Sequence, residues 1–150
     1  MKKYFAIVLL FLFGCAGYMP IEESERYTEY IEEHPLTKDK AYDATLEWIA
    51  TNFRSANTVI QLKEKENGRI IVQAVGSYSS DILQAVIMNY NYTFSIRIAD
   101  KKIKYEFTIN NIVGGSTPPT KHGLPDIKKS FIETKNSIQN AIKNYTGNVF

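Results

Sequence analysis

The chain has 150 residues, of which 44% are hydrophobic, 23% charged and 13% aromatic. This composition predicts one globular domain of ordinary size and excludes an intrinsically disordered chain. Eight Gly, five Pro and a single Cys exclude collagen-like, low-complexity and disulfide-rich proteins. The formal net charge of +2 includes Lys2 and Lys3, which lie in a predicted leader. The rest of the chain is neutral and gives no reason to expect a nucleic-acid partner.

The first 15 residues, MKKYFAIVLLFLFGC, place two lysines before an apolar run from Tyr4 to Phe13. Such a run covers only about half of the ~30 Å hydrocarbon core of a bilayer, which predicts a secretory signal peptide rather than a membrane span. The run ends in a segment that resembles the lipobox of bacterial lipoproteins, made of Leu12, Phe13, Gly14 and Cys15. The resemblance implies that residues 1–14 are removed and that Cys15 is acylated.

Two or more acyl chains on Cys15 would hold the protein on a membrane for long periods. Residues 15–25 have no apolar period and are predicted to form a lipidated tether. Residues 16–20 contain no acidic side chain, which favours the outer membrane, facing the periplasm, by analogy with lipoprotein sorting. We therefore expect a lipid-anchored protein of the cell envelope.

A single domain is predicted over residues 26–147. Residues 26–33 indicate a weak strand with Tyr27, Tyr30 and Ile31 as its anchors, and Pro35 ends it. Thr37 is a typical N-cap for a helix over 38–54. The apolar residues of this helix recur at spacings of four, three and four: Tyr42, Leu46, Ile49 and Phe53.

Two apolar segments, 59–62 and 69–75, flank Asn67 and Gly68, which predicts a β-hairpin with a two-residue type I′ turn and pairs Glu66 with Arg69. Both sides of this hairpin carry apolar residues. We therefore expect a helix on one side and a loop or a second subunit on the other, so that the 59–76 hairpin is the predicted surface of a homodimer.

The sequence leaves residues 78–89 open between strand and helix. From Tyr90 to Ile98, and again from Ile103 to Ile109, apolar and polar residues alternate, which predicts an antiparallel pair with one buried and one solvated face. The polar side chains of this pair form the candidate binding surface: Asn91, Thr93, Ser95, Arg97, Lys104, Glu106 and Thr108. Residues 110–125 predict an irregular loop, and a closing helix follows Pro125 until Gly147.

The resulting order, β-α-β-β-β-β-α, predicts an α+β fold with an antiparallel sheet of about five strands and two helices on one face. The stretch from residue 37 to 112 resembles a family of secreted bacterial proteins and lipoproteins of unknown function with a TATA-binding-protein-like (TBP-like) fold. The segments that carry the resemblance are Lys38-Asp39-Lys40-Ala41-Tyr42, Glu47-Trp48-Ile49, Ser55-Ala56-Asn57-Thr58-Val59-Ile60 and Lys65-Glu66-Asn67-Gly68-Arg69. The resemblance implies a fold but no reaction.

No catalytic, metal or cofactor site is predicted. Asp39, Asp43 and Glu47 share one helix face, a stripe that is typical of solvated helices. His34 and His122 have no second ligand at metal-binding spacing. We therefore expect the protein not to be an enzyme.

The sequence favours a non-catalytic binding or assembly module in the periplasm. Its partner would be another envelope protein, bound through the polar sheet face, the 110–125 loop or the 59–76 hairpin. Two alternatives stay open: an envelope hydrolase that uses His34 or His122, and a carrier of a small molecule between sheet and helices.

Overall fold

The computed structural model describes residues 20–79, 87–110 and 120–147. The predicted leader, Cys15 and most of the predicted loop lie outside these ranges, as does much of the 78–89 segment. The elements are η2 (Glu23–Glu25), β1 (Tyr27–Glu33), α2 (Lys38–Asn52), α3 (Ala56–Val59), β2 (Ile60–Glu64), β3 (Arg69–Ser79), β4 (Ile87–Ala99), β5 (Lys102–Ile109) and α4 (Leu124–Asn144).

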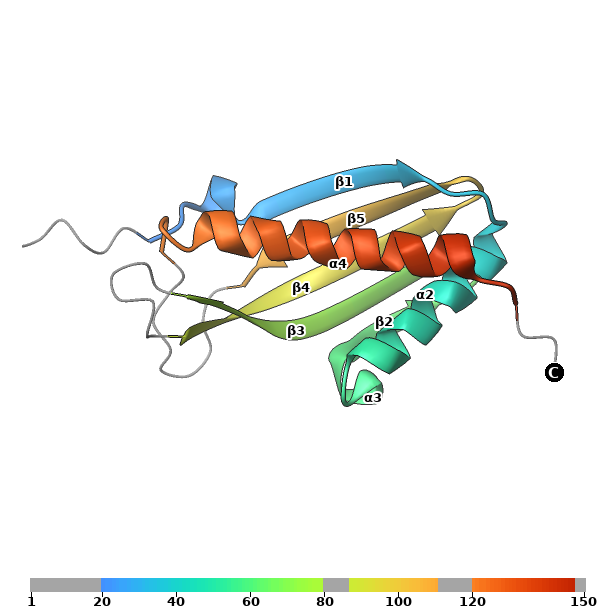
Figure 1. Cartoon of the computed structure of the whole chain (residues 1–150), viewed down its shortest axis with the longest axis horizontal. Coiled ribbons are helices and arrows are strands. Elements are labelled where there is room, and N and C mark those ends of the chain that lie inside the picture. The colour runs from blue at the N-terminus through green and yellow to red at the C-terminus, as the bar shows by residue number, and fades with distance from the viewer. Residues whose placement is uncertain (1–19, 80–86, 111–119, 148–150) are drawn as a thin grey trace, which may run out of the picture.

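The strands form one antiparallel five-stranded sheet in the order β1-β5-β4-β3-β2. Helices α2 and α4 lie on the same side of this sheet and contact each other, and α4 runs along the sheet's length (Figure 1). The predicted α+β architecture is therefore confirmed. One face of the sheet is buried beneath the helices, and we call the opposite face the open face.

The alternation predicted in β4 and β5 is confirmed by burial. Every second residue of the two strands is buried under the helices: Tyr90, Tyr92, Phe94, Ile96 and Ile98, with Ile103, Tyr105, Phe107 and Ile109. The ring of Phe107 stacks on Phe94 at 4.3 Å and on Phe131 of α4 at 4.4 Å between centroids. These three rings join sheet and helix in one hydrophobic core.

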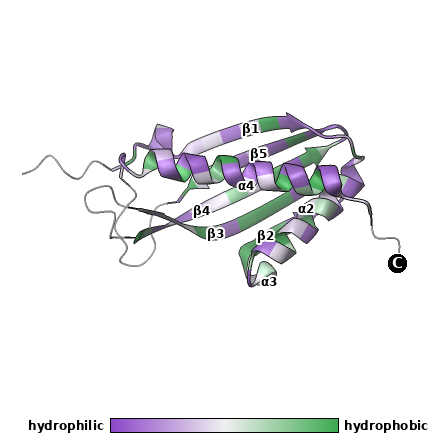
Figure 2. Cartoon of the chain, viewed as in Figure 1, coloured by the Kyte–Doolittle hydropathy of each residue, from purple (hydrophilic) through white to green (hydrophobic). Residues whose placement is uncertain are grey.

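Helix α4 shows why a partly polar sequence folds against this core. Hydrophobic and hydrophilic bands alternate along it (Figure 2), and its inner stripe buries Ile127, Phe131, Ile138 and Ile142. The helix begins at Leu124, slightly before the predicted start, with Pro125 in the first turn, where its missing N–H costs nothing.

Helix α2 begins at Lys38 as predicted, but the predicted N-cap is only partly right. Thr37 occupies the N-cap position without a side-chain hydrogen bond. Instead, the Lys38 backbone N–H donates to Asp100 Oδ1 at 2.9 Å, from the turn between β4 and β5. One of the free N–H groups at the start of α2 thus has its hydrogen-bond acceptor in a distant part of the chain.

The β2–β3 hairpin exists, but its predicted two-residue turn is wrong. Glu64, not Glu66, pairs with Arg69, so four residues form the connection. Among them only Gly68 has a positive φ, of 60°, and its N–H donates to the Lys65 carbonyl at 3.0 Å. The Gly68 carbonyl in turn accepts from the Ile98 N–H at 2.7 Å. This contact with β4 sets the shape of the turn, which the local Asn-Gly pattern could not reveal.

Residues 20–25, the last part of the predicted tether, pack against the domain. Ile21 is 3% exposed. Pro20 forms an isolated bridge with Thr120, and Lys121 Nζ lies 2.6 Å from Glu22 Oε1. These contacts hold residues 20–25 beside the start of α4.

Candidate functional site

The predicted binding surface lies together on the open face. Register pairs Thr93 with Thr108, Ser95 with Glu106, and Arg97 with Lys104, while Asn91 continues the same side of β4. Directly paired residues of an antiparallel sheet share a face. The structure therefore brings all the side chains of the predicted surface onto one side of β4 and β5.

Glu106 is the centre of an organised charge network on this face. Its Oε1 lies 3.1 Å from Lys104 Nζ and its Oε2 lies 3.2 Å from Arg97 Nε. The side chain of Glu106 is only 15% exposed. Burial alone would raise the pKa of Glu106, but the hydrogen bonds from Lys104 and Tyr27 and the charge of Arg97 outweigh it and hold the pKa below 4.5.

Strand β1 adds two residues to the network that the sequence did not single out as site residues. The Tyr27 hydroxyl donates to Glu29 Oε2 at 2.6 Å and to Glu106 Oε1 at 3.1 Å. Lys104 Nζ also lies 2.9 Å from Glu29. The hydrogen bond to Glu29, followed by burial and the contact with Glu106, raises the pKa of Tyr27 to about 12.

Tyr27 was predicted only as an anchor of its strand, together with Tyr30 and Ile31. Tyr30 is such an anchor, since its ring contacts the ring of Phe107 edge-on, with 6.2 Å between the centroids. Tyr27 and Ile31 instead point to the open face and are 46% and 62% exposed. The strict alternation of β1 could have shown that Tyr30 lies on the opposite face from Tyr27 and Ile31. Which of the two faces meets the core, however, depends on the pairing of β1 with β5.

Charges on the open face balance. The register places four basic side chains on it, Arg69, Arg97, Lys102 and Lys104, and four acidic ones, Glu29, Glu33, Glu64 and Glu106. The paired strand residues of this face therefore offer no excess of positive charge to a polyanion.

Three exposed apolar side chains accompany these charges on the open face. Ile31, Val75 and Ile87 are 62%, 66% and 73% exposed. An open depression of about 460 Å³ at the β3–β4 side is lined by Gln73, Val75, Asn91 and Asn110 together with Val59, Ala74 and Tyr92. The face thus combines fixed charges with apolar side chains.

The two histidines of the alternative hydrolase hypothesis differ in burial, since His34 is buried and His122 is exposed. His34 is 4% exposed, and its Nε2 lies 3.0 Å from the Ala99 carbonyl and 3.3 Å from the Lys102 carbonyl. The ring therefore holds the β4–β5 turn against β1. His122 lies in the turn before α4 and is exposed.

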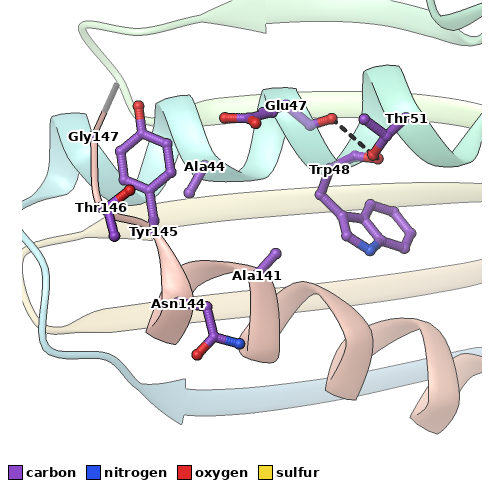
Figure 3. Close-up of a pocket in the computed structure, with 9 residues that line it drawn as sticks. All are labelled: Ala44, Glu47, Trp48, Thr51, Ala141, Asn144, Tyr145, Thr146 and Gly147. Carbon is purple, nitrogen blue, oxygen red and sulfur yellow. Dashed lines mark hydrogen bonds between the residues drawn. The ribbon is translucent and has the colours of Figure 1, made fainter. Parts of the chain in front are cut away.

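A second depression, of about 240 Å³, lies between α2 and the end of α4. Trp48 and Tyr145 stand at its two ends, with Ala44 and Ala141 between them (Figure 3). The Trp48 indole N–H donates to Ser137 at 2.9 Å, and the Thr51 hydroxyl donates to the Glu47 and Trp48 carbonyls. Because these polar groups are satisfied within the protein, the depression is best described as a seam between two helices.

In the part of the chain that the structure describes, no group of three or more His, Cys, Asp or Glu side chains lies close enough to hold a metal ion. Within the same ranges, no helix is long and apolar enough to cross a bilayer.

Comparison with known proteins defines the fold further. Residues 27–112 match the family model "Domain of unknown function (DUF4468) with TBP-like fold". A TBP-like protein from Parabacteroides distasonis is similar in structure, with a TM-score of 0.55 and 12% identity, over 81% of this chain and 97% of that one. A DUF4468 family protein from Bacteroides ovatus has a TM-score of 0.53 and 12% identity, over 85% and 93%. The comparison with curated proteins found no match.

Proposed function

This chain belongs to the family of domains of unknown function with a TBP-like fold (DUF4468), and from that premise we propose that it is a lipid-anchored, non-catalytic binding module of the cell envelope. Its open face would bind a second envelope protein. The leader supports the location, because the pattern from Leu12 to Cys15 resembles a lipobox. Because residues 16–20 contain no acidic side chain, the analogy with lipoprotein sorting favours the outer membrane, facing the periplasm.

The observation that carries the proposal is the organised network on a sheet face that no segment of the described ranges covers. Glu106 is fixed by Arg97, Lys104 and Tyr27, so that binding would not have to order these long side chains. Exposed apolar residues beside the network supply surface that a partner can bury. Protein interfaces combine these two kinds of surface.

Site-specific photocrosslinking in cells tests the partner surface. We expect a photoreactive residue at Thr108, which is exposed on the open face, to capture a discrete envelope protein. The same residue at Glu133, which is exposed on α4, serves as the matched control and should capture none. Arg97→Glu should abolish the Thr108 crosslink. Capture from Glu133 alone, or a Thr108 crosslink that is unaffected by Arg97→Glu, would overturn the proposal.

Fractionation tests the anchor separately. We expect the wild-type protein in the outer-membrane fraction with an acylated Cys15, and the Cys15→Ser variant outside the membrane fractions. Recovery of the wild-type chain from the cytosol with residues 1–14 uncut would contradict the anchor.

A further inference from the structure

Strand β1 forms one border of the sheet (Figure 1). It pairs with β5 along its whole length, and on its other side no strand of the described ranges pairs with it. Such an edge presents a row of backbone N–H and C=O groups to which a further strand can bind. The seven residues of β1 make this edge about 23 Å long.

The hydrogen bonds at the two ends of β1 show which of its backbone groups point outward. The Ile109 N–H donates to the Arg26 carbonyl at 2.9 Å, and the His34 N–H donates to the Lys101 carbonyl at 3.1 Å. Hydrogen-bonded and non-hydrogen-bonded pairs alternate along an antiparallel ladder. Because the register between these two ends is unbroken, the even-numbered residues of β1 bond to β5. The N–H and C=O groups that point away from β5 therefore belong to the odd-numbered residues, which are Tyr27, Glu29, Ile31 and Glu33.

The two edges of the sheet differ in how readily they can accept a strand. The β-bulge between Ile60 and Leu62 interrupts the pairing of β2, and bulges are one means by which proteins protect an edge. Strand β1 contains neither Pro nor Lys, and its register with β5 has no shift. The edge of β1 is therefore the one that a further strand can extend.

The side chains of β1 determine which strands can bind there. Its charged residues are Glu29, Glu32 and Glu33, and none of its residues is basic. Glu29 and Glu32 each form an ion pair with a lysine of β5 or α4, whereas Glu33 forms no ion pair with another described residue. A second copy of the chain would bring three more glutamates to the same seam, which like-charge repulsion disfavours. A strand that carries Lys or Arg is favoured instead.

We propose that the edge of β1 binds an extended basic segment of another protein, which adds a sixth, antiparallel strand to the sheet. The outward N–H and C=O groups of β1 would supply the hydrogen bonds, and side chains would supply the specificity. Basic side chains of the segment would lie opposite Glu29 and Glu33, and an apolar side chain would lie opposite Ile31, which is 62% exposed. This inference goes beyond the proposed function, because it concerns the backbone of a sheet edge and not the charge network on the open face.

A synthetic heptapeptide with blocked ends, Lys-Thr-Val-Thr-Lys-Thr-Val, tests this edge. In antiparallel alignment its lysines lie opposite Glu33 and Glu29, and its first valine lies opposite Ile31. The peptide is added to the ¹⁵N-labelled full-length chain in detergent, and the exchange of each amide proton with water is measured by NMR. At a peptide concentration of about five times the Kd, we expect the outward amides of β1 to exchange about sixfold more slowly.

N-methylated peptides distinguish backbone pairing from attraction between charges. In the same alignment the N–H groups of the third and fifth peptide residues point toward β1, whereas those of the fourth and sixth point away. Methyl groups on the third and fifth nitrogens should weaken binding by at least about tenfold. Methyl groups on the fourth and sixth nitrogens are the matched control and should leave the Kd nearly unchanged. A peptide with glutamate in place of both lysines should bind roughly tenfold more weakly than the parent peptide.

Substitution of Ile31 tests the same contact from the protein's side. Pro is tolerated on an edge strand where its nitrogen faces away from the sheet, so we expect Ile31→Pro to fold and to bind the peptide at least about tenfold more weakly. Ile31→Val, which keeps the backbone N–H, is the matched control and should bind as the wild type does. An intact spectrum of amide signals shows that each variant is folded, and the methylated peptides make the same test on the wild-type chain.

Three results would overturn the proposal: no slowing of exchange at the outward amides of β1, equal binding of the two methylated peptides, or binding of the glutamate peptide as tight as that of the parent. Equal binding of the methylated peptides would mean that the peptide is held by its charges alone. Because the peptide contacts the edge of β1 and not Arg97, these outcomes are independent of the crosslinking result at Thr108.

Discussion

Gly68 shows how one backbone position ties a hairpin to the rest of the sheet. Its φ is 60°, and a Cβ built on it would lie 2.0 Å from the Ile98 carbonyl oxygen. A side chain would therefore force both a left-handed backbone and a displacement of β4. No flexible group is available to relieve the clash, since the obstructing atom belongs to the backbone.

We expect Gly68→Ala to lower the free energy of unfolding by roughly 3 kcal/mol, from the left-handed backbone and the steric clash together. Gly147→Ala is the matched control, because Gly147 also has a positive φ, of 63°, but the nearest atom to its Cβ among the described residues would be a ring carbon of Tyr145 at 3.8 Å. The free energy of unfolding of Gly147→Ala should fall by no more than about 1 kcal/mol. Urea unfolding of both variants measures the difference, and equal losses would contradict the role of the Ile98 contact.

Tyr27 predicts a dependence of stability on alkaline pH. Its folded-state pKa of about 12 lies above the ordinary value of 10.0, so folding favours the neutral phenol. The stabilisation is complete below about pH 10 and is lost as the pH rises toward about 12. We therefore expect Tyr27→Phe to reduce the loss of stability between about pH 10 and pH 12, measured by urea unfolding.

Buried tyrosines also contribute to this loss of stability, because burial raises the pKa of Tyr92 to about 12. Tyr27→Phe should therefore reduce the pH dependence without abolishing it. Ile31→Val, a substitution on the same face of β1 that removes no titrating group, should leave the dependence unchanged. A Tyr27→Phe variant with the wild-type dependence would show that Glu29 and Glu106 do not hold the phenol neutral.

At the scale of elements, the stack of Phe94, Phe107 and Phe131 joins α4 to the sheet. We expect Phe131→Ala to cost about 3–5 kcal/mol, because it removes a buried ring and leaves a cavity between helix and sheet. The neighbouring Ile132 is 42% exposed, and Ile132→Ala should cost less than about 1 kcal/mol. Thermal and urea unfolding measure both, and similar losses would mean that the stack contributes little.

The elements that the sequence predicted best were those whose pattern is local. The period of two from Tyr90 to Ile109 needs only the pleat of a strand, and it identified both the buried face and the side of the sheet that bears the candidate surface. The closing helix followed from its apolar stripe in the same way. The family resemblance then supplied the fold into which these elements fit.

The features that the sequence missed depend on contacts between distant segments. Asp100 caps α2 across more than sixty positions of the chain, and Gly68 takes its conformation from Ile98. Tyr27 and Glu29 join the charge network only because β1 pairs with β5 in one register. Gln139 fits the stripe of α4 by its spacing, but no periodicity shows that a polar amide is buried there.

At the scale of the whole molecule, the helices cover only one side of the 59–76 hairpin, which is the predicted surface of a homodimer. Ile70 and Val72 are buried, whereas Val75 is 66% exposed and no described segment covers it. The β-bulge between Ile60 and Leu62 interrupts edge β2 and disfavours pairing along that edge. A second copy would therefore meet the hairpin through its face.

We expect the full-length protein in detergent to sediment as a dimer, and Val75→Lys to convert it to a monomer, because burying an unpaired ammonium group is costly. Gln73→Lys changes an exposed residue of the same face of β3 and, as the control, should disturb the dimer less. A wild-type protein that stays monomeric at all concentrations would exclude this contact.

The docking of Ile21 and Pro20 beside the start of α4 limits how the domain stands on a bilayer. If Cys15 is acylated as proposed, only residues 15–19 remain as spacer, and five extended residues reach at most ~17 Å. The end of the molecule that carries Thr120 would then rest close to the lipid headgroups. The opposite end, with the end of β1, the end of α4 and the beginning of α2 (Figure 1), would project into the aqueous compartment, where dissolved molecules can diffuse to it freely.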